Sequence, residues 1–188
     1  MVTSIVGSTN KPVASKRLVD YFNTREDLSG ILYVGYPIIG TSEGAYPIDA
    51  IWISREKGLV VFCLVEGKDT IGYENEQDDS CNKLDARLRS HKELMSKREL
   101  TVSIFAITFA PAVNLVNQND DYILCNEESL DSAIDSIKPW QNSENYETLV
   151  SVIQSVSMIR KSRKKRKVIN PESRGAKLQK IEDSIAKS

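Results

Sequence analysis

The stretch that most constrains the fold is "LVVFCLV", residues 59–65, which is apolar at every position. Successive side chains of a β-strand point to opposite faces of the sheet, so a strand without polar residues must be covered on both faces. The preceding stretch, Ile48–Ser54, is rich in β-branched and aromatic residues, and the polar turn "REKG" separates the two. This pattern predicts a β-hairpin over Ile48–Ser54 and Leu59–Glu66, at the centre of a sheet with helices on either side.

Further helices and strands are predicted around this hairpin. Before it, "ASKRLVDYFNTR" has the apolar spacing of a helix, and "GILYVGYPIIG" has the composition of a strand. After it, Leu84, Leu88, His91 and Met95 recur at intervals of three and four, which predicts an amphipathic helix over residues 76–98. The remaining predicted elements are strands at "LTVSIFAITFAP" and "DYILCN" and helices at "EESLDSAIDSI" and "NYETLVSVIQSVSMIRK". The order α-β-β-β-α-β-β-α-α indicates an α/β fold with a central mixed β-sheet flanked by helices.

Charge separates the chain into two parts. Residues 1–158 carry 14 Lys or Arg and 23 Asp or Glu, a net charge of −9, whereas residues 159–188 carry 11 and 3, a net charge of +8. We therefore expect a folded domain over residues 1–158 and a basic linker or tail over residues 159–188. No apolar run reaches the roughly 20 residues that span a bilayer, and the N-terminal residues do not have the pattern of a secretory signal. We expect no membrane segment and a cytoplasmic protein, or a nuclear one if the source is eukaryotic.

Charged residues lie at the outer ends of both hairpin strands. Asp49 is near the start of the first strand, and Glu66, Gly67 and Lys68 come at the end of the second. A turn of two or four residues would place Asp49, Glu66 and Lys68 on one face of the sheet, whereas a turn of odd length would separate them. With an even turn, two carboxylates and an ammonium group meet at one edge of the core.

Such a cluster suits metal-assisted hydrolysis of a phosphodiester. Mg²⁺ prefers oxygen ligands and keeps several waters, so one or two carboxylates plus substrate phosphate oxygens complete its coordination. In this interpretation Asp49 and Glu66 hold Mg²⁺ or Mn²⁺, and the carbonyl of Gly67 supplies a further ligand. Lys68 would orient the attacking water or offset the charge that develops on the phosphate.

The same residues carry a family resemblance. "PID", a hairpin and "EGK" resemble the PD-(D/E)xK nuclease superfamily, and "YPIDAIWISREKGLVVFCLVEGK" is similar to its nuclease-related domain, NERD. The resemblance implies a restriction-endonuclease-like core, metal binding by Asp49 and Glu66, and a catalytic role for Lys68. Family members often add an acidic residue from the first helix, for which this chain offers Asp20 or Glu26.

A basic run follows the predicted domain. Seven of the eight residues 160–167 are Lys or Arg, and such a run binds DNA phosphates without reading sequence. The predicted DNA contacts are Arg163, Lys164, Lys165, Arg166 and Lys167. The alternative is a solvated linker. The next segment, "NPESRGAKLQKIEDSIAKS", resembles the lead-in to the core of superfamily 1 helicases that carry a NERD-like domain, which implies a covalently linked or associated helicase as partner.

The function predicted from these features is that of a Mg²⁺-dependent deoxyribonuclease domain, the N-terminal part of a helicase-nuclease. The alternative is a non-catalytic module of the same fold that binds nucleic acid or a partner protein. Other reactive residue types are assigned to packing or solvent: His91, Trp52 and Trp140 to packing, the acidic run "ENEQDD" to a solvated loop before a helix, and Cys63, Cys81 and Cys125 to free thiols without a disulfide or a zinc site.

Overall fold

The computed structural model describes residues 1–36, 38–41, 44–114 and 121–155. The chain divides into two units, Met1–Ile153 and Gln154–Ser188, and the first of these contains almost all of the described residues. The basic run at residues 160–167 lies outside them. No helix in the described ranges is both long and apolar enough to cross a bilayer.

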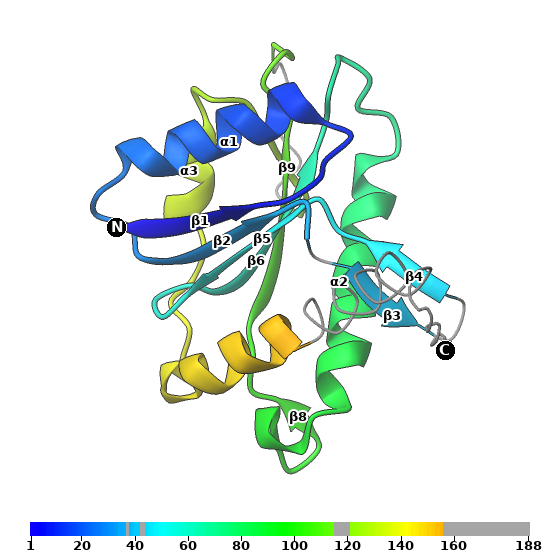
Figure 1. Ribbon diagram of the computed structural model, residues 1–188, viewed down its shortest axis with the longest axis vertical. Helices are drawn as coiled ribbons and strands as arrows, with labels where there is room; N and C mark the ends of the chain where they lie inside the picture. Colours follow the sequence, from blue (N-terminus) through cyan, green and yellow to red (C-terminus); the bar gives the residue numbers. More distant parts are fainter. Residues whose placement is uncertain (37, 42–43, 115–120, 156–188) are drawn as a thin grey trace, which may run out of the picture. The chain divides into compact units, whose positions relative to one another are not determined.

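A six-stranded mixed sheet forms the middle of the first unit (Figure 1). Its central strands run antiparallel, β2 (Gly30–Val34) with β5 (Ala50–Ser54) and β5 with β6 (Gly58–Leu64). Three parallel pairings extend it: β1 (Val2–Val6) on β2, β9 (Ile104–Phe109) on β6, and β10 (Ile123–Cys125) on β9. Two small hairpins stand apart from this sheet, β3 (Ile38–Thr41) with β4 (Gly44–Pro47), and β7 (Met95–Ser96) with β8 (Glu99–Leu100).

Helices cover both faces of the sheet. Helices α1 (Pro12–Thr24) and α3 (Leu130–Asp135) contribute Leu18, Phe22 and Ile134 to the core on one face. Helix α2 (Tyr73–Arg89) and the helical residues 146–153 contribute Leu84 and Leu149 to the core on the other. Short 3-10 helices occupy Lys92–Leu94 and Ser143–Asn145. The prediction of an α/β fold with a central mixed sheet flanked by helices is confirmed.

The hairpin that we expected at the centre of the sheet is there. All residues of β5 and β6 are buried, and their side chains alternate between the two cores. Trp52 and Phe62 face α1, where the ring of Phe22 lies 5.1 Å from that of Trp52 and 5.8 Å from that of Phe62, measured between centroids. Both tryptophans are packing residues as predicted, since Trp52 is fully buried and Trp140 is 6% exposed.

The sequence patterns missed or misplaced several elements. Strand β1 was not predicted, and "GILYVGYPIIG" contains the two strands β2 and β3 rather than one. The helix predicted over residues 76–98 begins earlier, at Tyr73, and ends earlier, at Arg89. It ends there because a 3-10 turn and the β7–β8 hairpin follow, and Lys97 in this hairpin has a positive φ of 60°. His91 therefore lies beyond the helix, half-buried. The run "ENEQDD" lies within α2, not in a loop before it.

The register of the β5–β6 hairpin also differs from both of those considered. Ser54 pairs with Gly58, which leaves a turn of three residues, an odd number. Ser54 Oγ accepts hydrogen bonds from the backbone N–H groups of Glu56 and Lys57, and this side chain shapes the turn. Gly58 has φ +83°, and a Cβ there would lie 2.8 Å from the carbonyl oxygen of Ser103, so the position requires glycine.

Candidate functional site

Asp49 lies immediately before β5, where it joins three segments of the chain. Its Oδ2 atom accepts hydrogen bonds from Lys11 Nζ and from the backbone N–H of Leu64, both at 2.9 Å. Lys11 Nζ also donates to the carbonyl oxygen of Leu64 at 2.8 Å. We call these three residues the Lys11 junction. The side chains of Lys11 and Asp49 are only 25% and 21% exposed, so solvent screens their ion pair incompletely.

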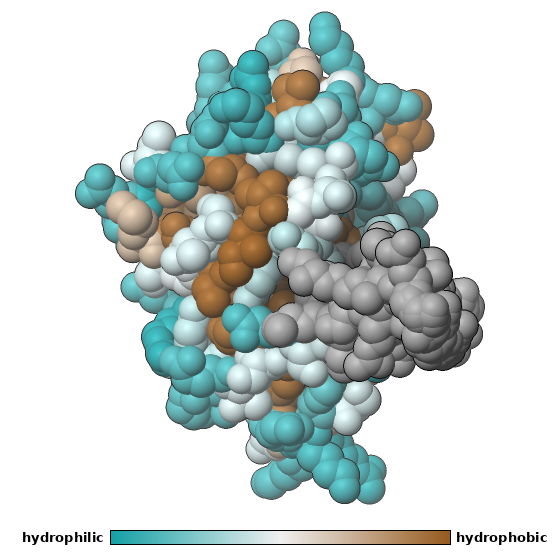
Figure 2. All heavy atoms as spheres, viewed as in Figure 1, coloured by the Kyte–Doolittle hydropathy of each residue, from teal (hydrophilic) through white to brown (hydrophobic). Residues whose placement is uncertain are grey.

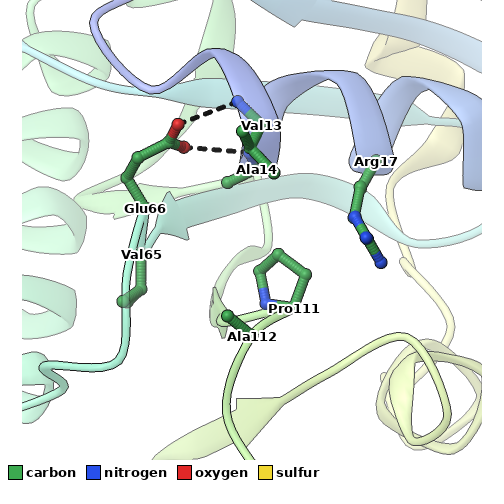
Figure 3. A pocket seen from close by; sticks show the side chains of 7 residues that line it. All are labelled: Val13, Ala14, Arg17, Val65, Glu66, Pro111 and Ala112. Atoms are coloured by element: carbon green, nitrogen blue, oxygen red, sulfur yellow. Dashed lines mark hydrogen bonds between the residues drawn. The ribbon is translucent and has the colours of Figure 1, made fainter.

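Glu66 lies after the end of β6 and binds the start of helix α1 (Figure 3). One carboxylate oxygen accepts a hydrogen bond from the N–H of Val13 and the other from the N–H of Ala14, each at 2.9 Å. Residue Lys11, which precedes the helix, supplies no side-chain cap. The first N–H groups of a helix lack partners within the helix and carry its positive dipole end, so an anionic side chain there stabilises it. Glu66 thus acts as a cap supplied by a distant strand.

Replacing Glu66 with alanine is therefore expected to weaken the start of α1. Loss of a capping side chain costs about 1 kcal/mol in the free energy of unfolding. Urea denaturation should show this loss, and amide hydrogen exchange at Val13 and Ala14 should accelerate. Glu66→Gln keeps an acceptor but no charge and should give a smaller loss, whereas Glu26→Ala, at an exposed position after the helix, serves as the control. Equal stability of the Glu66→Ala and control variants would contradict this role.

Gly67 and Lys68 are exposed in the segment that follows Glu66. A Cβ added at Gly67 would meet no atom within 4 Å, so this segment lies open to solvent. Among the described residues, no ion pair joins Lys68 to Asp49 or Glu66. Asp20, the acid considered from the first helix, pairs with Lys16 on the exposed surface of α1, and Glu26 is exposed after that helix.

The three-residue turn explains why the predicted residues separate. The observed register pairs Ala50 with Phe62, and continuing it by one residue places Asp49 opposite Cys63 rather than Leu64 or Glu66. A shift of one residue moves a side chain to the other face of a sheet. Asp49 is two residues before Ile51 and therefore lies on the same face of the sheet, the face that α2 covers. Glu66 binds α1 on the opposite face. The turn has the odd length that separates the two carboxylates, so the even turn on which a shared face depended is not formed.

Two residues that the sequence patterns did not single out are close to Asp49. One is Lys11, directly before the proline that begins α1. The other is Glu76 in the first turn of α2, whose charge interacts with those of Lys11 and Asp49. The side chain of Glu76 is exposed, but partial desolvation raises its pKa, and the Asp49 charge adds to this while Lys11 opposes it. Burial and the charge of Glu76 also raise the pKa of the Cys63 thiol to about 12, so this buried thiol stays protonated at neutral pH.

The raised pKa of Glu76 predicts a pH dependence of stability. A carboxyl group with a higher pKa in the folded state binds its proton more tightly there than in the unfolded chain. Stability from this group is therefore greatest at or below the ordinary carboxyl pKa of 4.5 and falls as the pH rises through the folded-state pKa. Glu76→Gln should remove that fall and be more stable than the parent at neutral pH. Urea midpoints measured across the acid-to-neutral range check this, and a variant less stable than the parent at neutral pH would contradict it.

A small pocket of about 70 Å³ lies at the start of α1 (Figure 3). Of the residues predicted to form the site, only Glu66 lines it, beside Arg17, whose guanidinium pairs with Glu127. Ligand pockets usually enclose several hundred Å³, so this one holds a few waters rather than a nucleotide. The other residues that line it are Val13, Ala14, Val65, Pro111 and Ala112.

The last site predictions concern a metal-binding group, the three cysteines and the basic run. In the part of the chain that it describes, no three His, Cys, Asp or Glu side chains are grouped so as to hold a metal ion. Cys63 and Cys125 are buried free thiols, and Cys81 is a partly exposed one. The predicted DNA contacts Arg163, Lys164, Lys165, Arg166 and Lys167 lie outside the described residues.

Comparisons of the chain with protein-family models, with curated proteins and with solved structures found no match.

Proposed function

We propose that the chain is a non-catalytic, nucleic-acid-binding module, in which the unit Met1–Ile153 has a nuclease-like core, and that it works beside a covalently linked or associated helicase. The observation that supports this proposal is that the chain itself supplies the partners of both predicted metal ligands. Asp49 is bound by Lys11 and by the Leu64 amide, and Glu66 by two amides of α1.

The arrangement of these carboxylates does not fit a shared Mg²⁺ site. A divalent cation at Asp49 would have to displace an ammonium group that also binds the carbonyl oxygen of Leu64. Both oxygens of Glu66 already accept hydrogen bonds, and a cation there would lie beside the positive end of the α1 dipole. Displacing Lys11 from Asp49 would leave a largely buried ammonium group without its counter-ion, which costs about 1–3 kcal/mol.

The basic run supplies the nucleic-acid contacts in this proposal. Residues 1–158 carry a net charge of −9, so the folded part repels a phosphate backbone, whereas residues 159–188 carry +8. We expect the run to hold DNA by sequence-independent phosphate contacts. In the sequence, this run lies between the folded part and the segment that resembles the lead-in to a helicase core.

Replacing Lys164, Lys165, Arg166 and Lys167 together with alanine should weaken DNA binding at every sequence. Each lost contact to duplex DNA should reduce the slope of log affinity against log salt by roughly 0.9. Fluorescence anisotropy at several salt concentrations measures this slope. A matched control replaces Lys92, Lys97, Arg98 and Lys138, which lie in the acidic folded part, and should leave the slope unchanged. If the two variants bind alike, the run is a linker and DNA binding is not its function.

The Mg²⁺-dependent nuclease is a second candidate, and the strand order agrees with it as it does with the first. Strands β2, β5 and β6 form an antiparallel meander, and α2 leads to β9 parallel to β6, the order that the family resemblance implies. In this reading Asp49 and Glu66 hold Mg²⁺ or Mn²⁺, and Lys68 acts on the attacking water.

Cleavage assays decide between the two candidates. Circular, linear and single-stranded DNA should stay intact with the purified full chain and Mg²⁺ or Mn²⁺ if the module is non-catalytic. The nuclease candidate instead requires cleavage that falls about 10²–10³-fold in Lys68→Ala, the usual loss for one electrostatic stabiliser. Lys138→Ala is the control, because Lys138 follows Ile137, whose carbonyl oxygen binds Lys57 in the turn at the opposite end of the hairpin from Lys68. Cleavage that depends on Lys68 would overturn the non-catalytic proposal.

A further inference from the structure

Strand β1 forms one edge of the six-stranded sheet (Figure 1). Its inner side pairs with β2 over all five residues, from Val2 opposite Gly30 to Val6 opposite Val34. Along its outer side, no strand is paired within the described ranges. An unpaired edge presents a row of N–H and C=O groups that can bind another strand.

The pairing with β2 fixes which backbone groups face outward. The N–H of Gly7 donates to the carbonyl oxygen of Val34, so residues of odd number direct their backbone groups toward β2. The N–H and C=O groups of Val2, Ser4 and Val6 therefore point away from the sheet. These three residues are placed symmetrically about Ser4.

The edge lacks the features that usually prevent strands from pairing with one another. Residues 1–10, "MVTSIVGSTN", contain no charged side chain and no proline, the two commonest protective devices. Ile5 is 38% and Val6 51% exposed, large fractions for apolar side chains on a strand. Figure 2 shows a strip of hydrophobic surface crossing the area in which Figure 1 places β1.

We propose that β1 pairs in antiparallel orientation with β1 of a second copy of the chain, about a two-fold axis at Ser4. Ser4 would then face Ser4 of the second copy, Val2 would face Val6, and Thr3 would face Ile5. All six outward-facing residues, three from each copy, form hydrogen-bonded pairs in this register, because their backbone groups point toward the new partner. Thr3 and Ile5 form the closer, non-hydrogen-bonded pair, which covers the exposed side chain of Ile5.

A second copy suits this edge better than an unrelated strand for a physical reason. Edges with identical charged side chains repel one another, and β1, which has no charged side chain, does not carry that penalty. The symmetric placement of the outward groups also satisfies each copy equally, as an isologous contact requires. A ladder of five residues buries little surface, so the dimer should be weak and depend on concentration.

Sedimentation equilibrium of the full chain over a range of concentrations tests this proposal. The parent should show a monomer–dimer equilibrium. Ile5→Lys should weaken association roughly tenfold or more, because the lysines at position 5 of the two copies would lie diagonally across the two-fold axis and repel one another. Ile71→Lys is the matched control, since Ile71 is 94% exposed and lies outside β1, and it should associate like the parent. Circular dichroism checks that each variant is folded.

Should Ile5→Lys fail to fold, Val6→Pro gives the same test, since it removes an outward N–H without touching the pairing to β2. Cross-linking then tests the register. A copy with Thr3→Cys mixed with a copy with Ile5→Cys should form a disulfide between chains, and either variant alone should not. A parent that is monomeric at every concentration, equal association of Ile5→Lys and the control, or cross-linking of Ile71→Cys to the same extent would each overturn the proposal.

Discussion

Asp49→Ala should lower the free energy of unfolding by about 2–3 kcal/mol, a large effect for a single polar side chain. Asp49 accepts hydrogen bonds from Lys11 Nζ and from the Leu64 amide, and both donors would lose this acceptor in a half-buried place. An ammonium group left without its counter-ion in such a place costs more than the ion pair itself contributes. Urea denaturation of parent and variant measures the difference.

Two further variants sharpen this result. Asp49→Asn keeps an oxygen for the Leu64 amide but removes the charge opposite Lys11, so its loss should be smaller than that of alanine. Asp20→Ala removes a carboxylate from an exposed ion pair with Lys16 and should change stability by no more than about 0.5 kcal/mol. If Asp49→Ala is as stable as Asp20→Ala, the Lys11 junction has no structural role.

Phe22→Ala is expected to be the most destabilising of the changes considered, at about 3–5 kcal/mol. Phe22 is fully buried, and its ring packs between those of Trp52 and Phe62, which join α1 to the two central strands. Truncation removes apolar burial and leaves a cavity that the rigid hairpin beneath it cannot fill. Thermal or urea denaturation measures the loss.

Val13→Ala is the matched control for this change, because Val13 lies on the same helix but is 57% exposed. Its backbone N–H still binds Glu66 after the substitution. The control should stay within about 0.5 kcal/mol of the parent. A loss below about 1 kcal/mol for Phe22→Ala would mean that α1 does not pack on the hairpin as described.

The layered fold was predictable because its strongest signals are local. Strand β6 is apolar at every position, and a strand of that composition has to lie between two layers of helices. Strand β1 gave no such signal. It has only five residues, two of them Thr and Ser, and it pairs with a strand that comes more than twenty residues later.

The candidate site was less predictable because it depends on contacts between distant residues. The hairpin register follows from the Ser54 hydroxyl in the turn and from the close approach of Gly58 to Ser103, which belongs to another part of the chain. The partner of Asp49 is Lys11, 38 residues earlier. No spacing rule in the sequence connects that lysine with the aspartate, whereas Glu66 and Lys68 lie within the quoted motif.

The central claim is that Asp49 and Glu66 stabilise the fold and do not bind a metal ion. Calorimetric titration of the full chain with Mn²⁺ tests this claim most directly. We predict no saturable binding that depends on Asp49, so the parent and Asp49→Asn should give the same heats. Binding of one equivalent of Mn²⁺ by the parent, lost in Asp49→Asn while a denaturation curve shows that this variant is folded, would contradict the account.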